Sequence, residues 1–474
     1  MRRSASDTFR PIVRFFDGRV VLLPVRCVSD SSMQLDWNLG STSSGLLLVM
    51  QVRAGAGWWA PTGLAFWPVL SRVHGFKSWV QCPRLMVTCL MLEGLRMKAM
   101  TSVWDHVGGW STPLPALDSP STLVVIFGDR AVEDDSRPVR EVVASFSTSV
   151  VIGCSTSGQI AGASLRDDVC VVAIARFDHV RLARAGADVS SGADSFAAGV
   201  AVGAGLAGED LRAVFVLSDG LCVNGSELVA GLISSVGPDV SVTGGLAGDG
   251  DRFERTWVID KGHLRAGRVV AVGLYGDGLL VGSGSEGGWS IFGPERVVTR
   301  SEGNVLYELD GKPALALYKR YLGDMACELP ASALLFPLAI RAGDEDEQLV
   351  RTVLGVDEVE QSMTFAGDVP QGWRAQLMRS SADRLVDGAE AAAVQSSAGF
   401  SSAGSTLGIA ISCVGRRLVL GARTEEEIEA TLEALPPATE LIGFYSYGEI
   451  APSGRLAQCA LHNQTMTLTT FAEV

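Results

Sequence analysis

The chain has 474 residues, of which 47% are hydrophobic and 19% are charged, and its formal net charge is −14. This composition excludes a disordered chain and a coiled coil, and the length is sufficient for two or three domains. The negative charge argues against nucleic acid as the main partner.

Residues 1–96 differ in composition from the rest of the chain. They contain 11 Lys and Arg against 5 Asp and Glu, whereas the remainder contains 28 against 48. They show no sustained apolar period of 2 or 3.6, so we expect no folded domain there. Met97 and Met100 stand where the composition changes. We therefore expect residues 1–96 to be a disordered extension, or to precede the true translation start, and to be dispensable.

Neither secretion nor a membrane span is predicted. Charged residues interrupt the first apolar stretch, which rules out the core of a signal peptide. The apolar run over residues 46–70 is broken by Arg53 and Pro61, so it falls short of the ~20 residues that cross a bilayer. The nine cysteines are scattered without metal-type CxxC spacing. We therefore expect a cytoplasmic protein.

From about Thr122, short buried strands alternate with helices. Ser136 is a candidate N-cap for a helix whose apolar residues recur at i, i+3, i+4 and i+7 from Val139. A second helix is predicted over residues 226–236. The predicted strands cover residues 122–127, 150–152, 169–175, 213–217 and 240–242. This alternation indicates a sheet that is partly parallel and covered on both faces.

A second unit is predicted from about Thr299. Pro313 suits the first turn of a helix that carries Leu315, Tyr318 and Leu322. Thr424 and Glu427 have the spacing of a capping box for a later helix. The strands predicted in this unit cover residues 334–340, 373–378, 407–413 and 441–447, and residues 396–405 are predicted to be a loop.

These elements predict a fold that combines α/β and α+β architecture, in which helices pack on the mixed sheets of two domains. We place the domains at residues 97–298 and 299–474.

Two motifs in the first domain are candidates for ligand binding. In residues 153–160, Cys154, Ser155 and Thr156 follow a predicted strand, where small residues can form an anion nest. Cys154 is also a candidate nucleophile. In residues 243–250, Gly244, Gly245 and Asp249 follow another strand, and such strand ends bind ligands in open α/β sheets. Ordinary tight turns are the alternative for both motifs. Dinucleotide and P-loop fingerprints are absent.

The second domain offers a candidate anion clamp. Ser412 and Cys413 end an apolar strand, and Arg416 follows them. Arg416 could bind a ligand carboxylate through two parallel hydrogen bonds. The alternative is a solvated pair of arginines, Arg416 and Arg417.

The last residues of the chain contain the densest group of polar side chains. They lie in two short strand-like runs, and if the runs pair, the side chains line one pocket. Glu449 could recognise an amine, and His462 could be a hydrogen-bond donor, a base or a haem axial ligand. The alternative for His462 is a core histidine bonded to the backbone. The candidate residues in this segment are Tyr445, Tyr447, Glu449, His462, Asn463 and Thr465.

Taken together, these motifs resemble the FIST sensory family, in which a FIST N-terminal and a FIST C-terminal domain occur in tandem. In the first domain the resemblance rests on residues 153–158, 218–220 and 244–249, and in the second on residues 303–309, 336–338, 412–416, 443–449 and 462–465. One departure is Gln159, where an acidic residue is expected.

The resemblance implies an intracellular sensor of a small ligand, for which amino acids or their relatives have been proposed. Such a sensor signals to a separate protein, such as a histidine kinase, a cyclic-nucleotide enzyme or a chemoreceptor. In this interpretation Arg416 meets the ligand's carboxylate and Glu449 its ammonium group, and neither a metal nor a cofactor is required. Some relatives resemble haem-based nitric oxide sensors, which makes a haem sensor with His462 as axial ligand the first alternative. A thiol enzyme that uses Cys154 or Cys413 with His462 is the second.

Overall fold

A computed structural model describes residues 97–474 except 330, 344–347, 401–403 and 454–457. The residues before these form a separate unit, Met1–Gly94, of which only the backbone of five strands is described. These strands are β1 (Met33–Thr42), β2 (Gly45–Ala54), β3 (Gly57–Trp59), β4 (Val80–Cys82) and β5 (Leu85–Val87). The rest of residues 1–96 lies outside the described part, so the prediction that this segment is dispensable stays a prediction.

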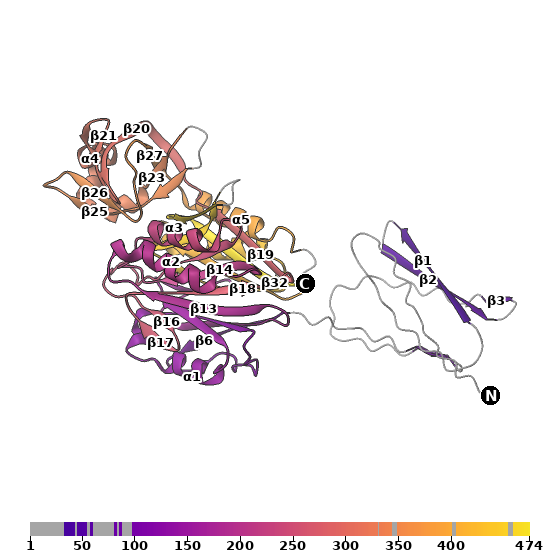
Figure 1. The fold of residues 1–474 in the computed structure, drawn as a ribbon. Coiled ribbons are helices and arrows are strands. Elements are labelled where there is room, and N and C mark those ends of the chain that lie inside the picture. Colours follow the sequence, from indigo (N-terminus) through magenta and orange to yellow (C-terminus); the bar gives the residue numbers. More distant parts are fainter. Residues whose placement is uncertain are drawn as a thin grey trace. The chain divides into compact units, whose positions relative to one another are not determined.

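The second unit, Leu95–Val474, contains three large sheets packed in two layers (Figure 1). Sheet I forms one layer, in the order β17 (His263–Arg265), β16 (Val258–Asp260), β9 (Val150–Ser155), β8 (Thr122–Gly128), β12 (Cys170–Arg176), β6 (Lys98–Asp105) and β7 (Gly109–Trp110). Its inner face packs against the second layer in one apolar core that includes Phe127, Phe215 and Phe444.

The second layer consists of two six-stranded sheets. Sheet II has the order β13 (Arg181–Asp188), β18 (Arg268–Tyr275), β14 (Leu211–Ser218), β15 (Ser241–Leu246), β30 (Gly448–Ser453) and β31 (Gln458–His462). Sheet III has the order β11 (Ser164–Arg166), β10 (Gln159–Ala161), β29 (Thr439–Ser446), β28 (Thr406–Cys413), β32 (Met466–Glu473) and β19 (Leu279–Glu286). The pairs β8–β9, β14–β15 and β28–β29 are parallel, as the alternation of strands and helices predicts.

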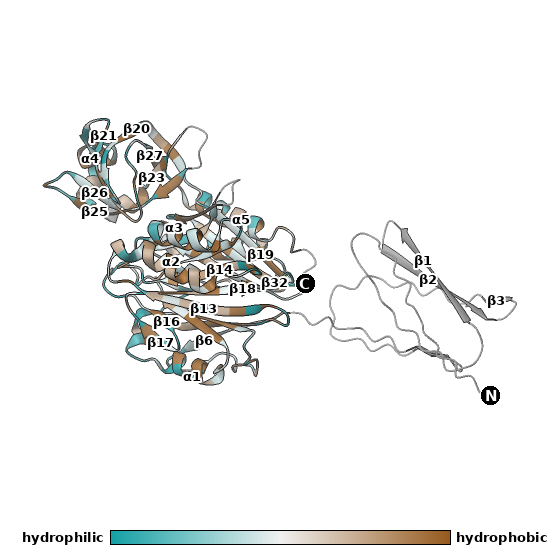
Figure 2. Cartoon of the chain, in the orientation of Figure 1, coloured by the Kyte–Doolittle hydropathy of each residue, from teal (hydrophilic) through white to brown (hydrophobic). Residues whose placement is uncertain are grey.

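Helices cover the outer faces of both layers. Helix α1 (Arg137–Ser145) packs on sheet I, α2 (Ser195–Leu206) and α3 (Gly225–Val236) on sheet II, and α5 (Ala382–Ser396) and α7 (Thr424–Ala434) on sheet III. Asn224 caps α3 by accepting hydrogen bonds from the backbone of Ser226 and Glu227. Hydrophobic residues follow the strands of these layers, and hydrophilic residues lie at the loops and outer helix faces (Figure 2).

A smaller lobe is inserted between β19 and α5. Sheet IV has the order β24 (Leu349–Arg351), β23 (Leu338–Arg341), β27 (Arg374–Arg379), β20 (Ser290–Glu302), β21 (Val305–Leu309), β26 (Ser362–Phe365) and β25 (Val353–Asp357), with β22 (Lys312–Pro313) on β21. Its two end strands are separated in the chain by Thr352 alone, so the sheet curls around its own apolar core with α4 (Ala314–Leu322). Two short 3-10 helices, η3 (Gly323–Glu328) and η4 (Ala331–Leu335), follow α4.

Strands from the two predicted domains share sheets. From the predicted domain at residues 97–298, β10 pairs with β29 and β19 pairs with β32 in sheet III. From the second half, β30 pairs with β15 in sheet II. Mixed sheets with packed helices are therefore confirmed, and residues on either side of residue 298 belong to the same layers. The domain limits themselves remain a prediction.

Three local predictions are wrong. Thr424 is the first residue of α7 rather than its cap, and its hydroxyl donates to Gly421 O, while Glu427 is buried and bonded elsewhere. The strand predicted over residues 334–340 begins only at Leu338, because the preceding residues form η4. Gly244 and Gly245 lie inside β15 rather than in a turn after it. A Cβ on Gly244 would lie 1.8 Å from Val216 O, so glycine is required there for close strand packing.

Candidate functional site

A polar pocket of about 310 Å³ opens where loops from residues 129–252 meet helix α6 (Val414–Leu420). Its lining carries four carboxylates and two guanidinium groups, together with backbone and hydroxyl groups. The lining residues are Asp129, Thr156, Ser157, Gly158, Asp167, Asp168, Gly250, Asp251, Arg252, Val414, Arg417 and Leu418.

The first wall is the loop that leaves β9, residues 156–158. Thr156 donates its hydroxyl to Gly128 O at 3.2 Å. Ser157 donates its backbone N–H to Tyr445 O at 2.8 Å, and Tyr445 returns its own N–H to Gly158 O at 2.9 Å. These two hydrogen bonds join the loop to β29. The position of the loop therefore depends on the pairing of β10 with β29.

The second wall is the loop over residues 249–255, which folds around the buried carboxylate of Asp249. That carboxylate accepts hydrogen bonds from the backbone N–H groups of Phe253, Glu254 and Arg255 and from the Tyr447 hydroxyl. Burial raises the pKa of Asp249, but these hydrogen bonds outweigh it and hold the pKa below its usual value. An ionised Asp249 therefore organises the loop that carries Asp251 and Arg252.

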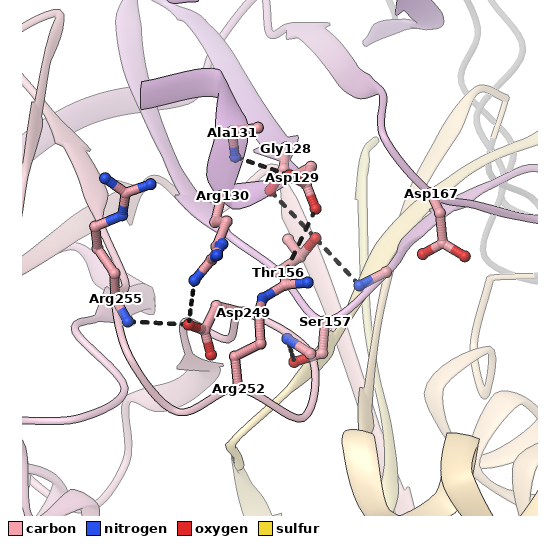
Figure 3. A network of polar contacts seen from close by, with 12 residues as sticks. Gly128, Asp129, Arg130, Ala131, Thr156, Ser157, Asp167, Asp249, Arg252 and Arg255 are labelled. Atoms are coloured by element: carbon pink, nitrogen blue, oxygen red, sulfur yellow. Dashed lines mark hydrogen bonds and ion pairs between the residues drawn. The ribbon is translucent and has the colours of Figure 1, made fainter. Parts of the chain in front are cut away.

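Arg130 closes this network on its outer side. Its Nη1 lies 3.6 Å from Asp249 Oδ2 and 2.8 Å from Glu254 Oε2. Figure 3 shows Asp249 between Arg130 and the backbone of Arg255, with Thr156, Ser157 and Arg252 close by and Asp167 on the side away from Arg255.

The third wall is α6, which begins directly after β28. Arg417 Nη2 lies 2.6 Å from Asp167 Oδ2, and its Nη1 donates to Ser157 O, so it joins the first and third walls. Arg416 lies next to it in sequence but is fully buried. Its guanidinium binds Glu427 at 2.7 Å and the carbonyl oxygens of Gly287 and Leu385.

A second polar cluster is buried around Glu449, in the first residues of β30. Its carboxyl accepts hydrogen bonds from Ser446 Oγ at 2.6 Å, Thr465 Oγ1 at 2.9 Å and Thr465 N at 3.2 Å. Burial raises the pKa of Glu449 to about 8, against the lowering effect of these bonds and of the nearby Arg416. Asn463 follows His462, the residue that pairs with Glu449 across β30 and β31, and its buried amide has no partner among the described residues.

The structure separates the predicted site residues into three groups. Thr156 lines the pocket. Asp249, Tyr445 and Tyr447 hold the pocket walls without lining it. The others are buried in strands, at strand ends or in helix α6 and are not among the lining residues, namely Cys154, Ser155, Gly244, Gly245, Ser412, Cys413, Arg416, Glu449, His462, Asn463 and Thr465.

The sequence interpretation missed most of the charged lining residues. Asp167, Asp168, Asp251 and Arg252 lie in exposed loops, where adjacent charges are also typical of an ordinary solvated surface. The predicted clamp named Arg416, whereas its neighbour Arg417 is the arginine of α6 that lines the pocket. A signal was present, since Asp251 and Arg252 follow directly on the motif at residues 243–250.

The two thiols and His462 lie in environments that suppress their reactivity. Burial raises the pKa of Cys154 well above its usual value, and it raises that of Cys413 with a smaller contribution from Glu449. Burial lowers the pKa of His462 to about 4, and its Nε2 lies 3.2 Å from Ala451 O. The prediction of a core histidine bonded to the backbone describes this geometry.

Within residues 97–474, as far as they are described, no group of His, Cys, Asp and Glu side chains is arranged to hold a metal ion. In the same part of the chain, every helix is too short or too polar to traverse a bilayer.

Comparison with known families identifies both halves of the chain. The family model of the FIST N domain matches residues 122–312, and that of the FIST C domain matches residues 314–452. No curated protein matches the chain. The pocket combines loops from the first matched range with α6 from the second.

Proposed function

Because the chain belongs to the FIST family, whose domains are associated with sensing small ligands in signal transduction, we propose that the pocket binds a small amino-acid-like ligand. The observation that carries this proposal is the composition of the pocket walls. One polar cavity is lined by groups of both charges, and both matched domains contribute to it. Its volume of about 310 Å³ lies at the lower end of the range for small-molecule sites.

The charges of the lining favour a ligand that has an ammonium group. Arg417 is already bound to Asp167, and Arg252 lies 3.9 Å from Asp129. The two other lining carboxylates, Asp168 and Asp251, have no hydrogen bond or ion pair with described residues. Four carboxylates against two guanidinium groups leave the lining with an excess of negative charge. A basic amino acid would neutralise this excess.

Arg252 is the lining group best suited to the ligand's carboxylate. Its side chain is 40% exposed, and its contact with Asp129 is long for an ion pair. A guanidinium can bind a carboxylate through two parallel hydrogen bonds. This replaces Arg416 and Glu449 as the expected partners of the carboxylate and ammonium groups, because Arg416 and Glu449 are fully buried.

The proposal includes a cytoplasmic location and a separate output protein, such as a histidine kinase, a cyclic-nucleotide enzyme or a chemoreceptor. The described cysteines support a reducing compartment, because Cys154, Cys170, Cys222, Cys327, Cys413 and Cys459 are all free. The family's role in signal transduction supports the output protein.

The structure gives less support to the two alternatives. A haem iron could reach His462 only if the ring left Ala451 O and the surrounding strands opened, so the residues present do not fit an axial ligand. A thiol enzyme would need a thiolate, and burial opposes ionisation of Cys154 and Cys413. A Soret band in the purified protein would support the haem alternative.

A thermal-shift screen of the common amino acids, followed by calorimetry, tests the proposal. A ligand at 100 times its dissociation constant should stabilise the protein by ~2.7 kcal/mol. We expect L-arginine or L-lysine to bind, and the double variant Asp168→Asn/Asp251→Asn to weaken that binding. Asp239→Asn is the matched control, because Asp239 is exposed and lies outside the pocket. If the double variant and the control bound the amino acid with equal affinity, the ligand would bind outside this pocket.

A further inference from the structure

Tyr447 connects sheets II and III to the pocket loop over residues 249–255. It stands between β29 and β30, is 8% exposed, and donates its backbone N–H to Leu246 O. Its hydroxyl bonds Asp249 Oδ1 and lies 3.0 Å from Gly250 O, and Phe253 N donates to the same hydroxyl at 3.3 Å. One phenol oxygen therefore contacts three residues of the loop.

The ring of Tyr447 makes a further contact with this loop. Phe253 stacks on it with 4.4 Å between ring centroids and 14° between ring planes. Phe253 has a φ of +52°, in the left-handed region that a bulky residue rarely adopts. The Phe253 side chain is also 46% exposed, so burial of its ring in an apolar core does not explain this conformation. The stacking and the hydroxyl contacts compensate for this backbone strain.

We propose that Tyr447 is a positioning residue of the pocket, whose hydroxyl holds the loop over residues 249–255 so that Asp251 and Arg252 face the ligand. This inference rests on the proposed function for its effect on binding, but the ordering of the loop can be measured without any ligand. Tyr447 itself is not a lining residue, so it acts through the loop.

The residues that precede Tyr447 in the sequence also contact the pocket walls or their supports. Tyr445, two residues earlier, exchanges backbone hydrogen bonds with the loop of Ser157 and Gly158. Ser446, between the two tyrosines, bonds Glu449, which in turn binds Thr465. One short segment thus holds two pocket walls, and Tyr447 supplies the side chain that holds the second wall.

Tyr447→Phe tests the proposal, because it removes the hydroxyl and retains the ring that stacks on Phe253. The control is Tyr275→Phe, which removes a buried hydroxyl that donates to Leu206 O at 2.6 Å, away from the pocket. In hydrogen exchange without ligand, the backbone amides of Phe253, Glu254 and Arg255 should exchange faster in Tyr447→Phe than in the wild type. Their exchange rates in the control should equal those of the wild type. Unchanged protection in Tyr447→Phe would overturn the proposal.

A double-mutant cycle with L-arginine as the probe tests the link to binding. Tyr447→Phe should weaken binding by about tenfold, at the upper end of the range for the net contribution of one hydrogen bond. Arg252→Gln should also weaken it. If Tyr447 acts through the loop, the double variant should lose less than the product of the two single losses. Independent effects would show that Tyr447 does not position Arg252. If the wild type does not bind L-arginine, the proposed ligand is wrong, while hydrogen exchange still decides whether Tyr447 orders the loop.

Discussion

Arg416 and Glu427 form an ion pair with 2.7 Å between Nη2 and Oε2, and neither side chain is exposed. Glu427 Oε1 also accepts hydrogen bonds from Tyr445 at 2.7 Å and Ser412 at 3.0 Å. The pair and these hydrogen bonds therefore tie α6, α7, β28 and β29 together. Because the remaining donors of Arg416 bind backbone carbonyls, its geometry is that of a structural residue.

Arg416→Met is expected to destabilise the protein by ~3–5 kcal/mol, because it leaves the carboxylate of Glu427 buried without its cation. Chemical denaturation measures this loss. Arg423→Met is the control, since Arg423 pairs with Asp383 and Glu426 at the surface and should cost less than ~1 kcal/mol. If Arg416→Met kept its stability and lost only ligand affinity, the predicted carboxylate clamp would be correct after all.

Glu449 should make stability depend on pH. Its folded pKa of about 8 lies above the ordinary value of 4.5, so the folded state binds the proton more tightly than the unfolded state does. This contribution is complete below pH 4.5 and is lost as pH rises toward 8, by at most ~1.4 kcal/mol per pH unit.

Glu449→Gln resembles the protonated acid and should remove this dependence. The unfolding free energies of the two proteins, measured from pH 5 to pH 8.5, should then diverge, with the wild type losing stability relative to the variant as pH rises. His462 acts in the opposite direction below its usual pKa, because its folded pKa of about 4 is depressed. Parallel curves for wild type and variant would mean that Glu449 does not titrate in this range.

Alkylation of the folded protein should distinguish the exposed thiol of Cys327 from the buried thiols of Cys154 and Cys413. Cys327 is exposed, whereas Cys154 and Cys413 are buried, and burial opposes formation of their thiolates. With iodoacetamide at pH 8, peptide mass spectrometry should find Cys327 modified first, and the other two only after denaturation. Rapid modification of Cys154 or Cys413 in the folded protein would support the thiol-enzyme alternative.

Gly244→Ala should be strongly destabilising, because the added methyl group would meet the backbone of β14 at a φ of +145°. Gly162→Ala provides the matched control. Gly162 also has a positive φ, of +59°, but nothing lies within 4 Å of its added Cβ. The control should lose only the ~1–2 kcal/mol that a left-handed conformation costs, and thermal unfolding compares the two. Equal losses would show that crowding at Gly244 is relieved by small shifts of the strands.

Several buried strands and amphipathic helices of the second unit could be predicted from the sequence, since their signals are local, whereas α2, α5 and many of the short strands were missed. The apolar face of residues 226–236 indicates α3, and the apolar run from Thr122 indicates β8. The motif at residues 443–449 likewise belongs to a family that the comparisons confirm. The capping box at Thr424 failed because the buried Glu427 has stronger partners in Arg416 and Tyr445 than the N-terminus of α7 offers.

The sequence by itself determined the family and the fold class, because motifs and apolar periods depend on near neighbours in the chain. Only the tertiary structure decided which side chains line the pocket. Successive residues of an α-helix differ by about 100° in direction, so Arg417 faces the pocket while Arg416 turns inward to Glu427. Likewise, Ser157 reaches Tyr445 only because β10 pairs with β29, and no local pattern specifies a pairing between strands so far apart in the chain.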